Sequence, residues 1–257
     1  VYEVIPIYGR RPFRLPEHLA RLQASMDGIR LSNPYTTEAW TALIGKLVEQ
    51  HEWADQSVYV QVTRGVAPRN HAFPKDAKPT VFVMTGPLSV PSREERDNGV
   101  DAITLNDYRW IRCNIKSTAL LANCMLKQAA VEAGCTEAIL LRDGFLTEGS
   151  STNIFVVKGN VLLAPPKSHL ILPGITYDVV IELAHAHGMP IEVRPVSESE
   201  VRSAEELWLS SSTKEVLAII RLDGKPVGNG KPGPMYRRMA GYFESSKATR
   251  SAAPAHA

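Results

Sequence analysis

The most distinctive part of the chain is the stretch Leu146-Thr147-Glu148-Gly149-Ser150-Ser151-Thr152-Asn153-Ile154-Phe155. An earlier stretch, Trp110-Ile111-Arg112-Cys113-Asn114-Ile115-Lys116-Ser117, contains a lysine that follows an apolar residue. Taken alone, Lys116 is typical of a solvated surface residue, and Glu148 is typical of a loop carboxylate. The interpretation of both residues therefore depends on the rest of the chain.

The composition is that of an ordinary globular enzyme. The 257 residues are 44% hydrophobic and 22% charged, and the formal net charge is +2,. There is no clustered basic run, which argues against a nucleic-acid surface, and no apolar run approaches the length of a membrane span. The three cysteines form no CxxC pair, so neither a disulfide framework nor a metal site is expected, and a cytoplasmic location is the default,.

Residues 1–87 predict a small N-terminal α/β domain. Strands are expected over residues 1–7, 57–63 and 79–85, and helices from Pro16 to Gly28 and from residue 37 onward,. Alternation in the second strand predicts that Val58, Val60 and Val62 share one face,. The strand over residues 79–85 is mostly apolar, which predicts burial on both faces.

A change of composition marks the predicted domain boundary. Residues 88–98 contain two prolines and a charged run, and we expect them to form a linker,. Residues 99–257 predict a larger C-terminal α/β domain that carries Lys116 at the end of a strand. Its helix over residues 117–133 presents Leu121, Met125 and Ala129 on one apolar face,.

The remaining elements complete a mixed α/β (α+β) fold of two domains. They are a strand over residues 137–142, a hairpin over 153–164 with Lys158-Gly159-Asn160 at its turn, a helix from Gly174 to His187, and strands over 191–195, 206–210 and 217–222,.

Four stretches together resemble a known family. They are residues 17–22 (Glu-His-Leu-Ala-Arg-Leu), 115–117 (Ile-Lys-Ser), 147–153 (Thr-Glu-Gly-Ser-Ser-Thr-Asn) and 172–176 (Leu-Pro-Gly-Ile-Thr). With these stretches the chain resembles the fold-type IV pyridoxal-phosphate aminotransferases over almost its whole length. Within that family it looks most like the D-amino acid transaminases. The resemblance implies a two-domain fold, pyridoxal 5′-phosphate as cofactor, and a homodimer.

The resemblance also implies how the cofactor is held. Lys116 would form the Schiff base with the cofactor and would act as the catalytic acid and base. Glu148 would keep the pyridine nitrogen protonated. The phosphate would be bound by Arg21, by the helix start at Ile175 and Thr176, and by the hydroxyl of Ser212.

Substrate binding is implied in the same way. Arg69 and His71, with Tyr2 from the first strand, would bind the α-carboxylate of the substrate. In the family this loop comes from the neighbouring subunit. Tyr59 is a candidate for the side-chain pocket, with core packing an equal alternative, and a position of Arg109 near the cofactor stays open.

The expected activity is D-amino acid:2-oxo acid transamination by a ping-pong mechanism, in which D-alanine and 2-oxoglutarate give pyruvate and D-glutamate. Other fold-type IV activities are alternatives: (R)-selective amine transamination, branched-chain transamination or aminodeoxychorismate lysis. A binding protein with a decayed site is a third possibility, and the combined presence of Lys116, Glu148, Arg21 and Thr176 argues against it.

Overall fold

The computed structural model describes the backbone of residues 1–251 and the side chains of residues 1–247. The chain divides into two compact units. Unit 1 consists of Val1–Ser89 and the short segment Ile115–Ala119; unit 2 consists of Val90–Asn114 and the chain from Leu120 onward. Lys116 thus groups with unit 1, whereas the sequence had placed it in the C-terminal domain. The domain boundaries at residues 87 and 99 stay a prediction.

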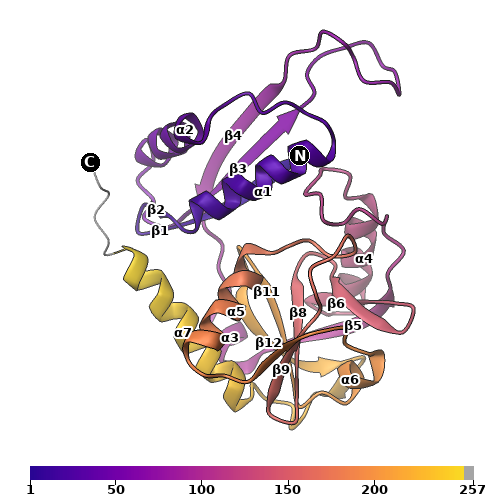
Figure 1. The fold of residues 1–257 in the computed structure, drawn as a ribbon. Helices are drawn as coiled ribbons and strands as arrows, with labels where there is room; N and C mark the ends of the chain where they lie inside the picture. The colour runs from indigo at the N-terminus through magenta and orange to yellow at the C-terminus, as the bar shows by residue number, and fades with distance from the viewer. Residues whose placement is uncertain (252–257) are drawn as a thin grey trace. The chain divides into compact units, whose positions relative to one another are not determined.

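Unit 1 is an antiparallel sheet with the strand order β2-β1-β3-β4 and with two helices on one face (Figure 1). Val58, Val60 and Val62 of the third strand are fully buried against the helices, as the alternation predicts. Each of these side chains contributes roughly 1.5–3 kcal/mol by leaving water. The elements of unit 1 are β1 (Tyr2–Tyr8), β2 (Arg11–Pro12), α1 (Leu15–Gly28), α2 (Thr37–Glu49), β3 (Gln56–Thr63) and β4 (Thr80–Pro87).

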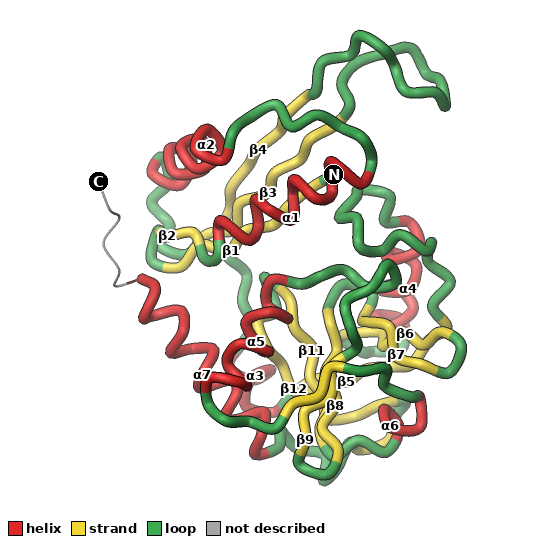
Figure 2. The backbone as a smooth tube through the Cα atoms, viewed as in Figure 1, coloured by secondary structure: helices red, strands yellow, loops and turns green. Residues whose placement is uncertain are grey.

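The prediction for β4 is wrong in one respect, because this strand is not buried on both faces. Its residues alternate between exposed and half-buried, and Phe82 and Met84 are 52% and 50% exposed. β4 is the edge strand of a sheet whose helices cover a single face, so the second face of β4 has no helix against it. A long loop extends beyond the ends of β3 and β4 (Figure 2).

Unit 2 is built on a nine-stranded mixed sheet with the order β10-β9-β8-β11-β12-β5-β6-β7, and β13 pairs with β12. The expected mixed α/β architecture is confirmed by this sheet and by the helices around it. The strands of unit 2 are β5 (Val100–Asn106), β6 (Glu137–Arg142), β7 (Phe145–Gly149), β8 (Asn153–Lys158), β9 (Val161–Ala164), β10 (Ile191–Val193), β11 (Glu206–Ser211), β12 (Glu215–Leu222) and β13 (Lys225–Pro226). The helices are α3 (Arg93–Asn98), α4 (Leu121–Glu132), α5 (Ile175–Ala186), α6 (Glu198–Arg202) and α7 (Pro234–Ser251).

Several central strands of unit 2, among them β6, β8 and β12, contain continuous apolar runs because both of their faces are covered. In β6, Ile139 and Leu141 belong to a core that they share with residues of β5, β7, β8, β9, β11 and β12 and with Val201 of α6. The alternate residues Ala138 and Leu140 pack against α4. Strands covered on both sides need no polar alternation, which explains the continuous apolar run in the sequence.

The helix after Lys116 differs from the prediction. α4 begins at Leu121, and the residues before it, Lys116 included, form neither a strand nor a helix. The buried face of α4 is Leu126 with Ala130, whereas Leu121 and Met125 are 76% and 56% exposed. The residues that pack against β6 therefore each follow by one position the residues Met125 and Ala129 of the predicted apolar face,.

Three helices of unit 2 were not predicted, and one of them lies in the expected linker. α3 and α6 each begin with a capping box, Ser92 with Glu95 and Ser197 with Glu200. The pattern Ser-x-x-Glu is a recognised helix start and could have indicated both. The third is α7. No helix in the described part of the chain is long and apolar enough to cross a bilayer.

Candidate active site

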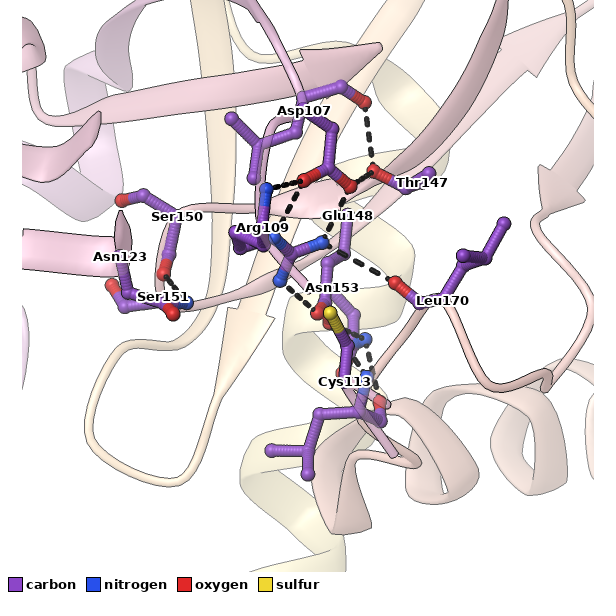
Figure 3. Close-up of polar contacts among 12 residues, drawn as sticks. Asp107, Arg109, Cys113, Asn123, Thr147, Glu148, Ser150, Ser151, Asn153 and Leu170 are labelled. Atoms are coloured by element: carbon purple, nitrogen blue, oxygen red, sulfur yellow. Dashed lines mark hydrogen bonds and ion pairs between the residues drawn. The ribbon is translucent and has the colours of Figure 1, made fainter. Parts of the chain in front are cut away.

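Glu148 is buried near the end of β7, and both of its carboxylate oxygens accept hydrogen bonds (Figure 3). Oε1 accepts from Nη1 of Arg109 at 2.5 Å. Oε2 accepts from the backbone N–H of Leu172 at 3.0 Å and from Nδ2 of Asn153 at 3.2 Å. The orientation of the carboxylate is therefore set from both sides.

Arg109 is in turn held by a second buried carboxylate, that of Asp107. Nε and Nη2 of Arg109 donate to the two oxygens of Asp107 at 2.9 and 2.8 Å, in the paired geometry that suits a guanidinium group,. Asp107 also accepts from Thr147 Oγ1 at 2.8 Å and lies 3.1 Å from Nη2 of Arg142. This cluster places one fixed positive charge beside Glu148 (Figure 3).

The two carboxylates differ in proton affinity. Burial raises the pKa of Glu148 to about 7, although Arg109 opposes the rise. Burial alone would raise the pKa of Asp107 too, but its hydrogen bonds and ion pair with Arg109 bring that pKa below the ordinary value. Arg109 favours the ionised form of Glu148, and an ionised, buried carboxylate in a fixed orientation can stabilise a protonated nitrogen next to it,.

The turn after Glu148 is built around a third buried carboxylate. Oε1 of Glu137 accepts hydrogen bonds from the backbone N–H and the hydroxyl of Ser150, and Oε2 accepts from Thr152 Oγ1 at 2.9 Å and Ser151 Oγ at 3.3 Å. At Gly149, a Cβ atom would lie 2.3 Å from Thr152 Oγ1, so a larger residue does not fit. The run Gly-Ser-Ser-Thr therefore supplies the hydroxyl groups and the space that this turn needs.

The start of α5, which belongs to unit 2 like Glu148, offers hydrogen-bond donors for an anion. Ile175 and Thr176 are its first two residues, both are buried, and the N-cap is Gly174, which has no side-chain oxygen to accept from them. A Cβ atom at Gly174 would lie 2.0 Å from Oδ1 of Asn153, the residue that also contacts Glu148. The N-terminus of a helix carries partial positive charge, so this arrangement fits a phosphate group.

Hydroxyl groups of the β11–β12 region belong to unit 2 as well. Ser212 follows β11 and is half-buried. The buried hydroxyl of Ser210 has no hydrogen-bond partner among the residues whose side chains are described. A buried carboxylate, a helix start and hydroxyl groups are the donor and acceptor set that a pyridine ring with a phosphate requires.

Lys116 is held by unit 1 through its backbone. Its N–H donates to Ser25 Oγ at 3.1 Å, and its carbonyl accepts from the N–H of Tyr2 at 3.0 Å. Its ammonium group lies 4.3 Å from the centre of the Tyr2 ring, and Tyr2 stacks on Tyr59 with 5.7 Å between the ring centres. The structure thus brings Lys116, Tyr2 and Tyr59 together, three residues that the sequence analysis had singled out separately.

Arg21 also lies in unit 1, in a buried cluster that the sequence analysis missed. Nε and Nη2 of Arg21 donate to the two oxygens of Glu3, each at 2.8 Å, and His18 Nδ1 lies 2.9 Å from the same carboxylate. Burial would raise the pKa of Glu3, but Arg21 and His18 together hold it well below its usual range. A signal was present, because alternation in β1 places Glu3 on the face of the buried Ile5 and Ile7,.

Arg69 and His71 lie in the loop between β3 and β4, and both are exposed. The structure therefore presents them at the surface of unit 1. Their role in binding a substrate stays a prediction.

Comparison with known proteins identifies the family. The chain matches the amino-transferase class IV family over residues 1–222. The chain belongs to this family. The family prediction is confirmed, and so is the prediction that the protein is an aminotransferase.

This class IV aminotransferase is similar to several proteins named as D-alanine aminotransferases. It is 41% identical to the D-alanine aminotransferase of Bacillus licheniformis, over 96% of this chain and 87% of that protein. It is 40% identical to the D-alanine aminotransferase of Listeria innocua, over 95% of this chain and 85% of that protein.

Solved structures show the same fold. The branched-chain amino acid aminotransferase of Escherichia coli superposes with a TM-score of 0.89 at 24% identity, covering 95% of this chain and 84% of that one. The T.th. branched-chain amino acid aminotransferase, solved with pyridoxamine 5′-phosphate, has a TM-score of 0.88 at 25% identity and covers 97% of this chain and 85% of that one.

Proposed function

We propose that this aminotransferase transfers the amino group of a D-amino acid such as D-alanine to a 2-oxo acid such as 2-oxoglutarate, with pyridoxal 5′-phosphate as its cofactor. Two D-alanine aminotransferases at 41% and 40% identity over nearly the whole chain support the substrate class. The structural observation that carries the cofactor proposal is Glu148, a buried carboxylate that Arg109, Asn153 and the backbone N–H of Leu172 hold in one orientation.

Pyridoxal 5′-phosphate, when bound, would supply an electron-withdrawing ring that stabilises negative charge at the substrate's α-carbon. Glu148 would accept a hydrogen bond from the protonated pyridine nitrogen and so favour its protonated form, while Arg109 keeps that carboxylate oriented,. The amine of Lys116 takes the proton from the α-carbon in one half-reaction and returns one in the other. Ser25 and Tyr2 anchor the backbone of Lys116 and so limit where the amine can reach,.

The phosphate is proposed to be bound by three kinds of donor. Ile175 and Thr176 supply backbone N–H groups at the start of α5, and the hydroxyls of Thr176 and Ser212 add further donors,. Arg21 supplies a guanidinium that Glu3 holds in one orientation,.

The α-carboxylate of the substrate is proposed to be bound by Tyr2, Arg69 and His71, with Tyr59 beside the side chain of the substrate. Stacking of Tyr59 on Tyr2 supports a shared role for the two rings. Arg69 would distinguish an amino acid donor from an amine donor, because an amine donor has no α-carboxylate group for this guanidinium to bind.

We also propose that the active unit is a homodimer in which the loop of one subunit completes the site of the other. Exposed apolar side chains on β4 and α4 support an interface, namely Phe82, Met84, Leu121 and Met125,. A cytoplasmic location is proposed because Cys113, Cys124 and Cys135 are all free thiols,.

The dimer proposal is tested by mixing two inactive variants, Lys116→Ala and Arg69→Ala, and allowing subunits to exchange. If the loop acts in the neighbouring subunit, half of the dimers are hybrids with one intact site, and about a quarter of the wild-type activity returns. No recovery after confirmed exchange would show that the loop acts within its own subunit.

The substrate proposal is tested by a single half-reaction. The purified holoenzyme is mixed with D-alanine or with L-alanine, and the visible absorbance band of the lysine-bound cofactor is followed. We expect loss of the band and release of pyruvate with D-alanine, and little change with L-alanine. Conversion of an amine without a carboxylate group at a comparable rate would favour the amine transaminase alternative.

A further inference from the structure

The loop between β3 and β4 is closed at its base. Gly65 has φ +100°, and a Cβ atom there would lie 1.9 Å from the carbonyl oxygen of Lys78. The two ends of the loop therefore touch through their backbones, directly after the last paired residues of the two strands, Thr63 and Thr80. A loop whose ends meet in this way is a compact surface loop and not an open connection.

The far part of this loop is fastened back to its base by Phe73. The guanidinium carbon of Arg64 lies 3.7 Å from the centre of the Phe73 ring, and that of Arg30 lies 5.1 Å from it. Both distances are within the range of cation–π contacts. Phe73 is 49% exposed, so these contacts, and not burial, account for its position.

Arg64 is itself fixed to the end of α1. Its Nη2 donates to the carbonyl of Ile29 at 2.6 Å, and its Nη1 donates to the carbonyl of Arg30 at 3.0 Å. These carbonyls follow the last turn of α1, where a positive charge is favourable,. The contacts thus run without interruption from helix α1 through Arg64 to the ring of Phe73.

Phe73 lies two residues after His71 and four after Arg69. The segment between them is restrained locally as well, because the N–H of Ala72 donates to Oδ1 of Asn70 at 3.3 Å. A residue that fixes the chain at this point limits the positions that both side chains can adopt.

We infer that Phe73, held by Arg64 and Arg30, is a positioning residue that sets where Arg69 and His71 meet the carboxylate of the substrate. This inference rests on the proposed function of that pair. Phe73 would act on specificity through the pair that it positions.

The test compares Phe73→Leu, which keeps an apolar side chain without a ring, with Phe73→Tyr, which keeps the ring. For Phe73→Leu we expect KM for D-alanine to rise about three- to tenfold, with kcat and the affinity for pyridoxal phosphate unchanged, whereas Phe73→Tyr stays close to wild type. Phe145→Leu is the matched control, since Phe145 is 48% exposed and lies in unit 2.

A second measurement does not depend on activity. Trypsin should cut after Arg69 faster in Phe73→Leu than in wild type, because the released loop reaches the protease more often. An unchanged KM and an unchanged cleavage rate would overturn the inference, and so would equal losses in kcat, KM and cofactor affinity, which would indicate a general structural defect. If Arg69→Ala also leaves KM for D-alanine unchanged, the carboxylate role proposed for the pair fails instead, and the inference fails with it.

Discussion

Replacing Arg109 should damage both the stability of unit 2 and its affinity for the cofactor. The side chain is 3% exposed and lies between two buried carboxylates, those of Asp107 and Glu148. Arg109→Met leaves both carboxylates without this cation, and breaking a buried ion pair in that way costs about 3–5 kcal/mol. Arg109→Lys keeps the charge but loses the forked geometry, so we expect a loss of roughly 2–3 kcal/mol, the value of one or two charge-assisted hydrogen bonds.

The assay is urea unfolding of the cofactor-free protein at pH 7.5, followed by titration with pyridoxal phosphate. Arg194→Met is the matched control, because Arg194 also binds two carboxylates, Glu192 and Glu200, but is 39% exposed. Exposed pairs contribute about 0–1 kcal/mol, so this variant should unfold almost like wild type.

Arg109→Met should also change how cofactor binding depends on pH. The pKa of Glu148 is already raised to about 7 by burial, and Arg109 is the charge that opposes the rise. Without Arg109 that pKa should move higher, so the pH at which cofactor affinity changes should move upward with it. If Arg109→Met lost less than about 1 kcal/mol and kept the wild-type pH profile of cofactor binding, this account of Glu148 would be refuted.

Three further predictions concern other residues of the site. The pKa of Glu3 is lowered in the folded protein, so the stabilisation from this carboxylate is complete above the pKa that Glu3 has in the unfolded chain,. The stabilisation is lost as the pH falls from that value toward the lower pKa of the folded state. Glu3→Gln should therefore flatten the dependence of the unfolding free energy on pH below about pH 5,. Gly149→Ala should destabilise the protein and weaken cofactor binding, because the added Cβ atom would lie 2.3 Å from Thr152 Oγ1. The control is Gly45→Ala on α2, where an added Cβ atom meets open space, and thermal unfolding should show it to be neutral or stabilising by up to about 1 kcal/mol,. Thr176→Val should lower the affinity for pyridoxal phosphate about tenfold in titrations, with an unchanged Tm of the cofactor-free protein, since the shape is kept and one hydroxyl is lost.

Local pattern was sufficient where the structure depends on neighbours in sequence. The hairpin turn at Gly159 and Asn160 was predicted, and both residues have positive φ, 56° and 60°, as the turn requires,. The start of the helix at Ile175 was also predicted, from the Gly174 before it. In both places the residue types alone restrict the backbone.

The surroundings of Glu148 could not be predicted in the same way. Asp107 and Arg109 follow β5, whereas Glu148 lies in β7, and they meet because β5, β6 and β7 are consecutive in the sheet. That strand order is decided by pairing between distant segments, which one sequence does not display. Glu137 was missed for the same reason, since its partners come from the turn after β7.

The position of Lys116 has a consequence for recombination between relatives. The lysine is distant in sequence from Tyr2 and Ser25, yet its backbone forms hydrogen bonds with both residues, and all three belong to unit 1. A chimera with its junction at Ser89 would keep each continuous stretch intact, but would give this lysine a foreign first strand and first helix. A junction that respects the folded units must exchange Ile115–Ala119 together with Val1–Ser89, so this enzyme should be recombined in three pieces and not in two.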